Sequence, residues 1–126
     1  MNIQLIGSKV VDLSLSKTDK DIEKMEFGVS NAFSKDVLNS FIIDFNLKLK
    51  VDDNYMLTIQ HISQFEADED IDEEKKLSPF FSINAPAIAY PFLRAYVANF
   101  LLSSGYDPEL LPTINFVKLA ENESSE

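Results

Sequence analysis

The sequence predicts a single α+β domain in which a four-stranded antiparallel sheet carries a long helix on one face. Two observations predict this fold. Apolar and polar residues alternate in four stretches with short polar connections, and an apolar stretch near residues 90–104 has helical spacing. Short connections favour antiparallel strands, and a sheet with one apolar face needs a cover. A chain of 126 residues allows one modest core.

The first two expected strands span residues 3–15 and 25–33. In the first, alternate apolar side chains share one face: Ile3, Leu5, Val11, Leu13 and Leu15. Gly7 permits a bulge in this strand, because glycine adopts irregular backbone conformations easily. In the second, apolar side chains alternate with Lys24, Glu26 and Gly28: Met25, Phe27 and Val29. Each strand therefore has one face for a core.

The third and fourth strands are expected to form a hairpin. Alternation is cleanest over residues 40–51, with one apolar face: Phe41, Ile43, Phe45, Leu47, Leu49 and Val51. Asp52-Asp53-Asn54 is a turn by residue type, and the alternation resumes from Tyr55 to Phe65. His61, the only histidine, lies on the apolar face of the last strand. We interpret it as a packed structural residue, because no second histidine or cysteine accompanies it.

A helix is expected from about Tyr90 to Ser104, with Pro91 in its first turn and Gly105 just past its end. Four apolar residues with spacings of i, i+4, i+7 and i+8 share one face of this helix: Leu93, Val97, Phe100 and Leu101. The other side is also apolar: Phe92, Ala95, Tyr96, Ala98 and Leu102. Such a helix needs covers on more than one side. The sheet is one cover, and a second subunit is the expected other.

Composition excludes several classes of function. The net charge is −10 and there is a single arginine, which disfavours nucleic-acid binding. An acidic surface keeps a protein soluble and attracts basic segments of partners. The N-terminal segment lacks the pattern of a signal peptide, and no apolar run approaches membrane-spanning length. A cytoplasmic protein without membrane contact is expected.

Neither an enzyme nor a metal site is expected. The sequence contains no cysteine, no glycine-rich phosphate loop, and no motif that pairs a nucleophile with a base. Residues 66–74 form an acidic run in which Asp68, Asp70 and Asp72 have the alternation of a calcium loop. The glycine and distal glutamate of such a loop are missing, so a solvated, mobile connector is expected. No cofactor is predicted.

Two segments resemble the SecB family of protein-export chaperones. Residues 85–95, APAIAYPFLRA, are similar to the family segment C-P-x-x-L-F-P-Y-A-R-E. Residues 107–116, DPELLPTINF, resemble its F-P-x-L-x-L-x-P-V-N-F, with one residue fewer. The resemblance implies a homotetramer built as a dimer of dimers, with the long helix between sheets. It also implies a holdase that binds non-native, extended polypeptides in apolar grooves without nucleotide.

The resemblance and the apolar, proline-broken segments together indicate a set of client-binding candidates: Phe80, Phe81, Tyr106, Leu110, Leu111, Ile114 and Phe116. For each of them, ordinary core packing is the alternative. The expected oligomer contacts lie on the helix: Phe92, Tyr96, Asn99 and Phe100. Arg94 stands at the arginine of the family motif, and an arginine in an apolar helix needs a carboxylate or carbonyl partner.

Departures from the family pattern leave the partner open. Asp12 matches an acidic contact to the translocase motor SecA, but Ser16 and Thr58 stand where the family has acids. The expected domain, residues 1–119, is followed by a polar, disordered tail at 120–126 that is too short for much of the family's terminal helix. The client is accordingly either an exported protein or an antitoxin of a toxin–antitoxin system. An oligomeric adaptor that binds one folded partner through its sheet face is the alternative function.

Overall fold

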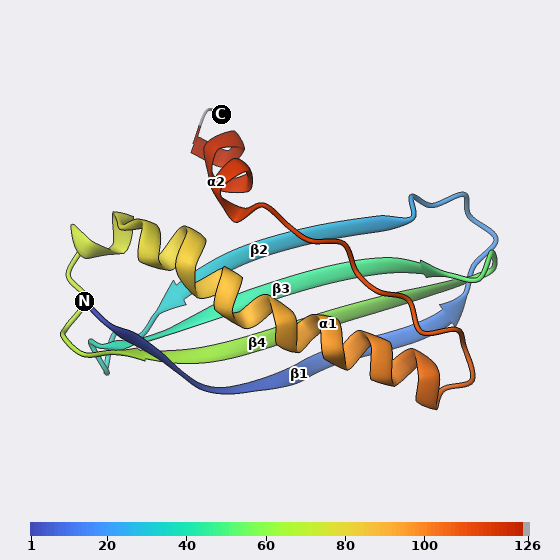
Figure 1. Ribbon diagram of the computed structural model, residues 1–126, viewed down its shortest axis with the longest axis horizontal. Coiled ribbons are helices and arrows are strands. Elements are labelled where there is room, and N and C mark those ends of the chain that lie inside the picture. Colours follow the sequence, from blue (N-terminus) through green and yellow to red (C-terminus); the bar gives the residue numbers. More distant parts are fainter. Residues whose placement is uncertain (125–126) are drawn as a thin grey trace.

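The computed structural model describes residues 1–124, and the side chains of residues 1–121. One antiparallel sheet contains β1 (Ile3–Lys17), β2 (Met25–Phe33), β3 (Ser40–Val51) and β4 (Tyr55–Ala67). The strand order is β1-β4-β3-β2, so the connection after β1 leads to the opposite edge of the sheet. Helix α1 (Ala85–Ser103) crosses one face of the sheet diagonally, and α2 (Phe116–Ser124) lies on the β2 side (Figure 1). The predicted α+β class is confirmed.

The central strands β3 and β4 supply most of the core, as their alternation predicts. The face toward α1 consists of buried side chains: Phe41, Ile43, Phe45, Leu47, Leu49, Val51, Leu57, Ile59, Phe65 and Ala67. The side chains that alternate with them, on the other face of the sheet, are more exposed. The predicted hairpin is present, and Asp52 adopts a φ of +47° in its turn. Aspartate is among the few non-glycine residues that enter this region at modest cost.

Strand β1 contains two bulges where the sequence predicted one. Its register with β4 shifts between Leu5 and Gly7, as expected, and again between Val10 and Asp12. Each bulge adds one residue and moves the side-chain alternation by one position. Val10 therefore faces the core and Val11 is 43% exposed, so the placement of Val11 on the apolar face was wrong.

Helix α1 begins five residues before the predicted start at Tyr90. Its buried stripe repeats every fourth residue: Ala85, Ala89, Leu93, Val97 and Leu101. Pro86 lies in the first turn, the position expected for Pro91, whereas Pro91 lies inside the helix. Burial of the longer stripe on the sheet offsets the hydrogen bond that an internal proline removes. Gly105 follows the helix with a φ of +90°, as a terminating glycine does.

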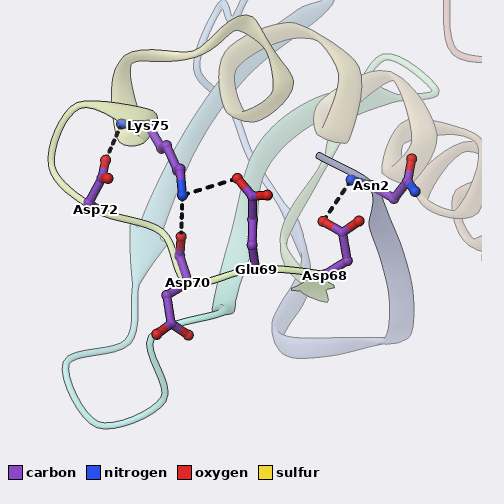
Figure 2. A network of polar contacts seen from close by, with 6 residues as sticks. All are labelled: Asn2, Asp68, Glu69, Asp70, Asp72 and Lys75. Carbon is purple, nitrogen blue, oxygen red and sulfur yellow. Dashed lines mark hydrogen bonds and ion pairs between the residues drawn. The ribbon is translucent and has the colours of Figure 1, made fainter.

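The acidic connector between β4 and α1 is exposed except at Ile71, which is buried, and it is organised around one lysine (Figure 2). The ammonium of Lys75 lies 3.0 Å from a carboxylate oxygen of Glu69 and donates to the backbone carbonyl of Asp70, also at 3.0 Å. The backbone N–H of Lys75 donates to the Asp72 carboxylate at 2.8 Å. The hydrogen bond to Glu69 is the main cause that raises the pKa of Lys75, and the negative charges of Glu69, Asp72 and Asp70 act in the same direction. A 3₁₀ turn (Lys75–Leu77) and a π-helical turn (Phe80–Asn84) then lead into α1.

Helix α2 overlaps the segment that was expected to follow the domain. α2 includes residues 120–124, which were expected to belong to a disordered tail. Residues 125 and 126 of that predicted tail lie outside the described residues.

Candidate functional site

The segment that joins α1 to α2, residues 104–115, runs back along the sheet without regular secondary structure (Figure 1). We call it the crossover segment. Pro108 and Pro112 remove two backbone donors, so the segment cannot join the sheet as a regular strand. Several contacts fix it, including two hydrogen bonds that join it to α1. The Tyr106 N–H donates to the Leu101 carbonyl at 2.9 Å, and the Tyr90 hydroxyl donates to the Pro112 carbonyl at 2.6 Å.

A groove of about 500 Å³ lies between the crossover segment and the start of β2. Five of its eight lining residues are apolar and three are charged: Met25, Leu49, Leu110, Leu111 and Pro112, with Glu23, Lys24 and Glu109. Leu110 is 72% exposed, so an aliphatic side chain is offered to solvent. Lys24 and Glu109 form an ion pair of 3.1 Å that connects the two sides of the groove. Because β2 is an edge strand, its outer backbone groups are also available. This arrangement can accept apolar side chains and the backbone of an extended chain.

An aromatic cluster packs α1 and α2 against the sheet. The Tyr90 ring packs edge-on against Phe27 at 5.6 Å, Phe116 at 5.8 Å and Phe45 at 6.1 Å. Burial raises the pKa of Tyr90, and the positive charge of Arg94 acts in the opposite direction. The Tyr90 hydroxyl is therefore a neutral donor at physiological pH, as its bond to Pro112 requires.

Arg94 lies one helical turn beyond Tyr90, with its guanidinium carbon 6.0 Å from the Tyr90 ring. Its Nε is buried and has no hydrogen-bond partner among the residues that the structure describes. The ion pairs found among those residues join lysines to glutamates, at Lys24, Lys75 and Lys76. For this nitrogen, the partner that an arginine in this helix was expected to need is not found in that part of the chain.

The outer face of α1 carries a second apolar surface, which we call the outer stripe. Its large side chains are exposed although α1 is packed on the sheet: Ile88 (43%), Phe92 (52%), Tyr96 (37%) and Leu102 (62%). Of the expected oligomer residues, Phe92, Tyr96 and Asn99 are exposed on α1. Phe100 differs, because it is half-buried against the core and stacks on Tyr96 with ring centres 6.2 Å apart.

The predicted client-binding residues separate into three groups. Leu110 is exposed at the groove, while Phe80, Tyr106 and Ile114 are half-buried at the margin of the core. Phe81, Leu111 and Phe116 are buried, although Leu111 also lines the groove. Phe81, for example, packs edge-on against Phe41 at 4.8 Å, and a client cannot reach it in this conformation.

Sequence reasoning missed Met25 and Leu49 in the groove. They are register partners on β2 and β3, and both appear as ordinary core positions in the alternation. The signal that could have found Met25 is its place at the start of an edge strand, where one side has no neighbouring strand. That signal depends on the strand order, which the alternation does not reveal.

Two further residues named from the sequence lie outside this groove. Asp12 lies on the open face of the sheet, in a shallow polar pocket that Glu26, Lys48 and Gln60 also line. His61 is buried beside Phe45, with ring centres 6.4 Å apart, which agrees with the expected packed role. Burial lowers the pKa of His61.

Neither a cluster of metal ligands nor a membrane-spanning helix is found in the described part of the chain. No three side chains of the ligand types histidine, cysteine, aspartate and glutamate converge there. The helices described for residues 1–124 also lack the length and apolar character needed to cross a bilayer.

Comparison with known sequences identifies one family. The profile described as SecB, preprotein translocase subunit SecB, matches residues 11–126. The protein-export protein SecB of Roseobacter denitrificans is 33% identical over 85 residues, which cover 64% of this chain and 50% of that protein. The protein-export protein SecB of Anaplasma phagocytophilum is 30% identical over 73 residues, covering 57% and 46%. The chain thus spans about half the length of the curated relatives that it matches.

Solved structures show the same fold. The Mycobacterium tuberculosis Rv1957 SecB-like chaperone, in complex with a ChAD peptide from the Rv1956 HigA1 antitoxin, superposes with a TM-score of 0.68 at 14% identity. The match covers 90% of this chain and 91% of that one. A protein of unknown function from Streptococcus agalactiae gives a TM-score of 0.63 at 12% identity and covers 90% and 98%. At these identities the likeness concerns the fold alone.

Proposed function

Since this chain belongs to the SecB family, we propose that it is an ATP-independent holdase that binds non-native, extended polypeptide. The observation that carries the proposal is the apolar groove beneath the crossover segment, with Leu110 72% exposed beside an open strand edge. A folded protein seldom leaves such a surface uncovered without a use for it. A groove lined by flexible aliphatic side chains accepts many client sequences, because it depends on apolar burial more than on a fixed pattern of polar contacts.

We assign client contact to Leu110 and Met25, which line the groove; Leu49 also lines it but is buried. Tyr106, Ile114 and Phe80 do not line the groove, but each is half-buried at the margin of the core, and we propose them as additional client contacts. Of the buried predicted residues, Leu111 lines the groove, whereas Phe81 and Phe116 pack in the core and do not line it. The net charge of −10 favours clients with basic segments and keeps a protein with exposed apolar surface soluble. The proposed holdase works in the cytoplasm, needs no cofactor and catalyses no reaction.

We further propose that four copies assemble as a dimer of dimers through the outer stripe of α1. An exposed row of Ile88, Phe92 and Tyr96 on a packed helix is the kind of surface that a second subunit covers. Asn99 and Phe100 were placed in this interface from the sequence. Asn99 is exposed, so we keep it in the proposed interface. Phe100 is half-buried and contributes through its stacking on Tyr96.

An antitoxin is a second candidate for the client. The SecB-like chaperone of the same fold was solved in complex with an antitoxin peptide. Ser16 and Thr58 also stand where the family has acids, so that of these three positions Asp12 alone keeps the acid. Both observations favour dedicated binding of an antitoxin over delivery to SecA. A pull-down from the native host separates the two roles by enrichment of a single small antitoxin or of SecA.

The experiment that tests the holdase is suppression of aggregation without nucleotide. A chemically unfolded client is diluted into buffer with and without equimolar protein, and light scattering is followed. Reduced scattering without ATP is expected, and added ATP should change nothing. Scattering equal to the control would contradict the holdase and leave the adaptor of one folded partner as the better account.

A further inference from the structure

One ion pair spans the groove between the crossover segment and β2. The ammonium of Lys24 lies 3.1 Å from a carboxylate oxygen of Glu109, and both residues line the groove. The backbone of Lys24 is held by β3, because its carbonyl accepts a hydrogen bond of 2.9 Å from the Lys50 N–H. The side chain of Lys24 is 79% exposed. Its ammonium can therefore leave Glu109 without a change in the sheet.

The pair is weak on the side of Lys24 and stronger on the side of Glu109. An exposed ion pair contributes little, because water screens its charges and an ordered lysine loses rotamer freedom. The side chain of Glu109 is only 32% exposed, and a partly buried charge is screened less than an exposed one. The groove therefore contains a carboxylate that attracts a cation but holds its present cation loosely.

A client that fills the groove has to displace or accommodate this pair. Glu109 directly precedes Leu110, which is 72% exposed, so an apolar client side chain packed on Leu110 lies next to the carboxylate. A neutral segment that moves Lys24 aside leaves the carboxylate covered and without a cation, which is unfavourable. A segment with a lysine or arginine beside its apolar side chain replaces the lost cation instead.

We propose, on the basis of the holdase function above, that Glu109 binds a basic side chain of the client in exchange for Lys24. Lys24 is then a built-in occupant of the groove that competes with the client. The segments that bind best are extended and carry lysine or arginine next to an aliphatic or aromatic side chain. The net charge of −10 acts in the same direction, because it attracts basic segments to the surface as a whole.

Glu23 is the other acid that lines the groove. Its side chain is exposed, so water screens its charge more strongly than that of the partly buried Glu109. Glu23 also lies beside Lys24 on the β2 side of the groove, whereas Glu109 is adjacent to Leu110. We therefore assign the contact to Glu109, and the experiment compares the two acids directly.

The test uses two peptides and a set of glutamine variants. Both peptides are fluorescein-labelled, have about 15 residues, alternate leucine or phenylalanine with serine, and end in an amide. One has a central lysine and the other a central glutamine. Each is titrated by fluorescence anisotropy at physiological ionic strength, where the charge screening length is about 8 Å. The protein variants are Glu109→Gln, Glu23→Gln, Lys24→Gln and the double variant of Lys24 and Glu109.

Two matched controls remove the same charges outside the groove. Glu26 and Lys48 are exposed and lie on the open face of the sheet, so Glu26→Gln and Lys48→Gln change the net charge but not the groove. The wild type should bind the lysine peptide more tightly than the glutamine peptide. Glu109→Gln should lose most of this preference, whereas Glu26→Gln should keep it.

Removal of the competing lysine should strengthen binding. Lys24→Gln should bind the lysine peptide about two to five times more tightly than the wild type does, because one exposed ion pair no longer has to be broken. Lys48→Gln should show no such gain. In the Glu109→Gln background the change at Lys24 should have no effect, because the two residues act through one contact.

Three results would overturn the proposal. They are a preference in Glu109→Gln equal to that of the wild type, a preference that is lost in Glu23→Gln instead, and a lysine peptide that gains nothing from Lys24→Gln. Failure of both peptides to bind the wild type would count against the holdase itself, whereas equal binding of the two peptides counts only against Glu109. If Glu109→Gln loses the folded circular dichroism spectrum, Glu109→Asp takes its place, and its shorter side chain should weaken the preference.

Discussion

The Tyr90 hydroxyl donates a hydrogen bond of 2.6 Å to the backbone carbonyl of Pro112 and so ties α1 to the crossover segment. Tyr90 is buried in an aromatic cluster and cannot move independently, so the bond transmits the rigidity of the core to a segment without regular structure. The groove beside Pro112 consequently has one wall that is fixed at this point and one exposed aliphatic side chain, Leu110, further along.

Removal of this bond should loosen the wall of the groove. Tyr90→Phe keeps the ring in the cluster and deletes the donor, leaving the Pro112 carbonyl without that partner. We expect a loss of about 1 kcal/mol in the free energy of unfolding, measured with urea, and faster amide exchange in the crossover segment. Tyr55→Phe is the control, because no hydrogen bond from the Tyr55 hydroxyl is found among the described residues. Equal losses in both variants would contradict this role of Tyr90.

Gly105 should be intolerant of substitution for a reason of backbone conformation alone. Its φ is +90°, and an added Cβ would meet no atom within 4 Å. Gly105→Ala should therefore lower the free energy of unfolding by about 1 kcal/mol through strain at the end of α1. Gly28→Ala has the same open surroundings without the positive φ, so it should be nearly neutral or stabilising. If the two variants cost the same, strain at Gly105 is not the cause.

His61 should make stability depend on pH. Burial lowers its pKa in the folded state below the ordinary value of 6.5, so the unfolded chain binds a proton more readily. Stability from this group is complete above pH 6.5 and falls as the pH drops toward the folded pKa, by at most about 1.4 kcal/mol per pH unit. Urea midpoints of the wild type should therefore be lower at pH 5.5 than at pH 7.5. His61→Gln should remove most of this difference; an equal pH dependence in the variant would show that another group is responsible.

The outer stripe should hold the tetramer together. Phe92→Asp or Tyr96→Asp places a charge on an exposed apolar row without touching the core, so multi-angle light scattering should report dimers in place of tetramers. Val117→Asp, at a side chain 48% exposed on α2, should keep the wild-type mass. Wild-type mass in all three variants would remove α1 from the interface. Phe100→Asp is less suitable, because Phe100 packs against the core and the change would also destabilise the protomer.

The sequence predicts the sheet and α1 because alternation and fourfold spacing are local properties. It does not predict that β1 lies next to β4, since the short connection after β1 is compatible with a hairpin to β2 as well. The second bulge, near Val11, contains no glycine that would indicate it. The start of α1 at Ala85 could not be predicted either. It depends on Ala85 and Ala89 being buried on the sheet, which the local sequence does not reveal.

The candidate site could be predicted in part. Leu110 was identified because apolar residues between prolines have no strand or helix to bury them. Phe81 and Phe116 carried the same signal, but aromatic rings gain more from burial and were taken into the core. Met25 and Leu49 could not be found, because their role depends on which strand forms the edge beside the crossover segment.

Client binding at the groove is the central claim, and Leu110→Asp tests it most directly. The matched control is Leu77→Asp, because Leu77 is also a highly exposed leucine (86%) but does not line the groove. Affinity for one labelled, unfolded client is measured by anisotropy for the wild type and both variants. Leu110→Asp should weaken binding by at least about tenfold, since a carboxylate replaces an apolar contact worth about 1.5–3 kcal/mol, while Leu77→Asp should bind as the wild type does. Equal affinity of Leu110→Asp and the wild type, in a protein that still binds clients, would place the binding site elsewhere.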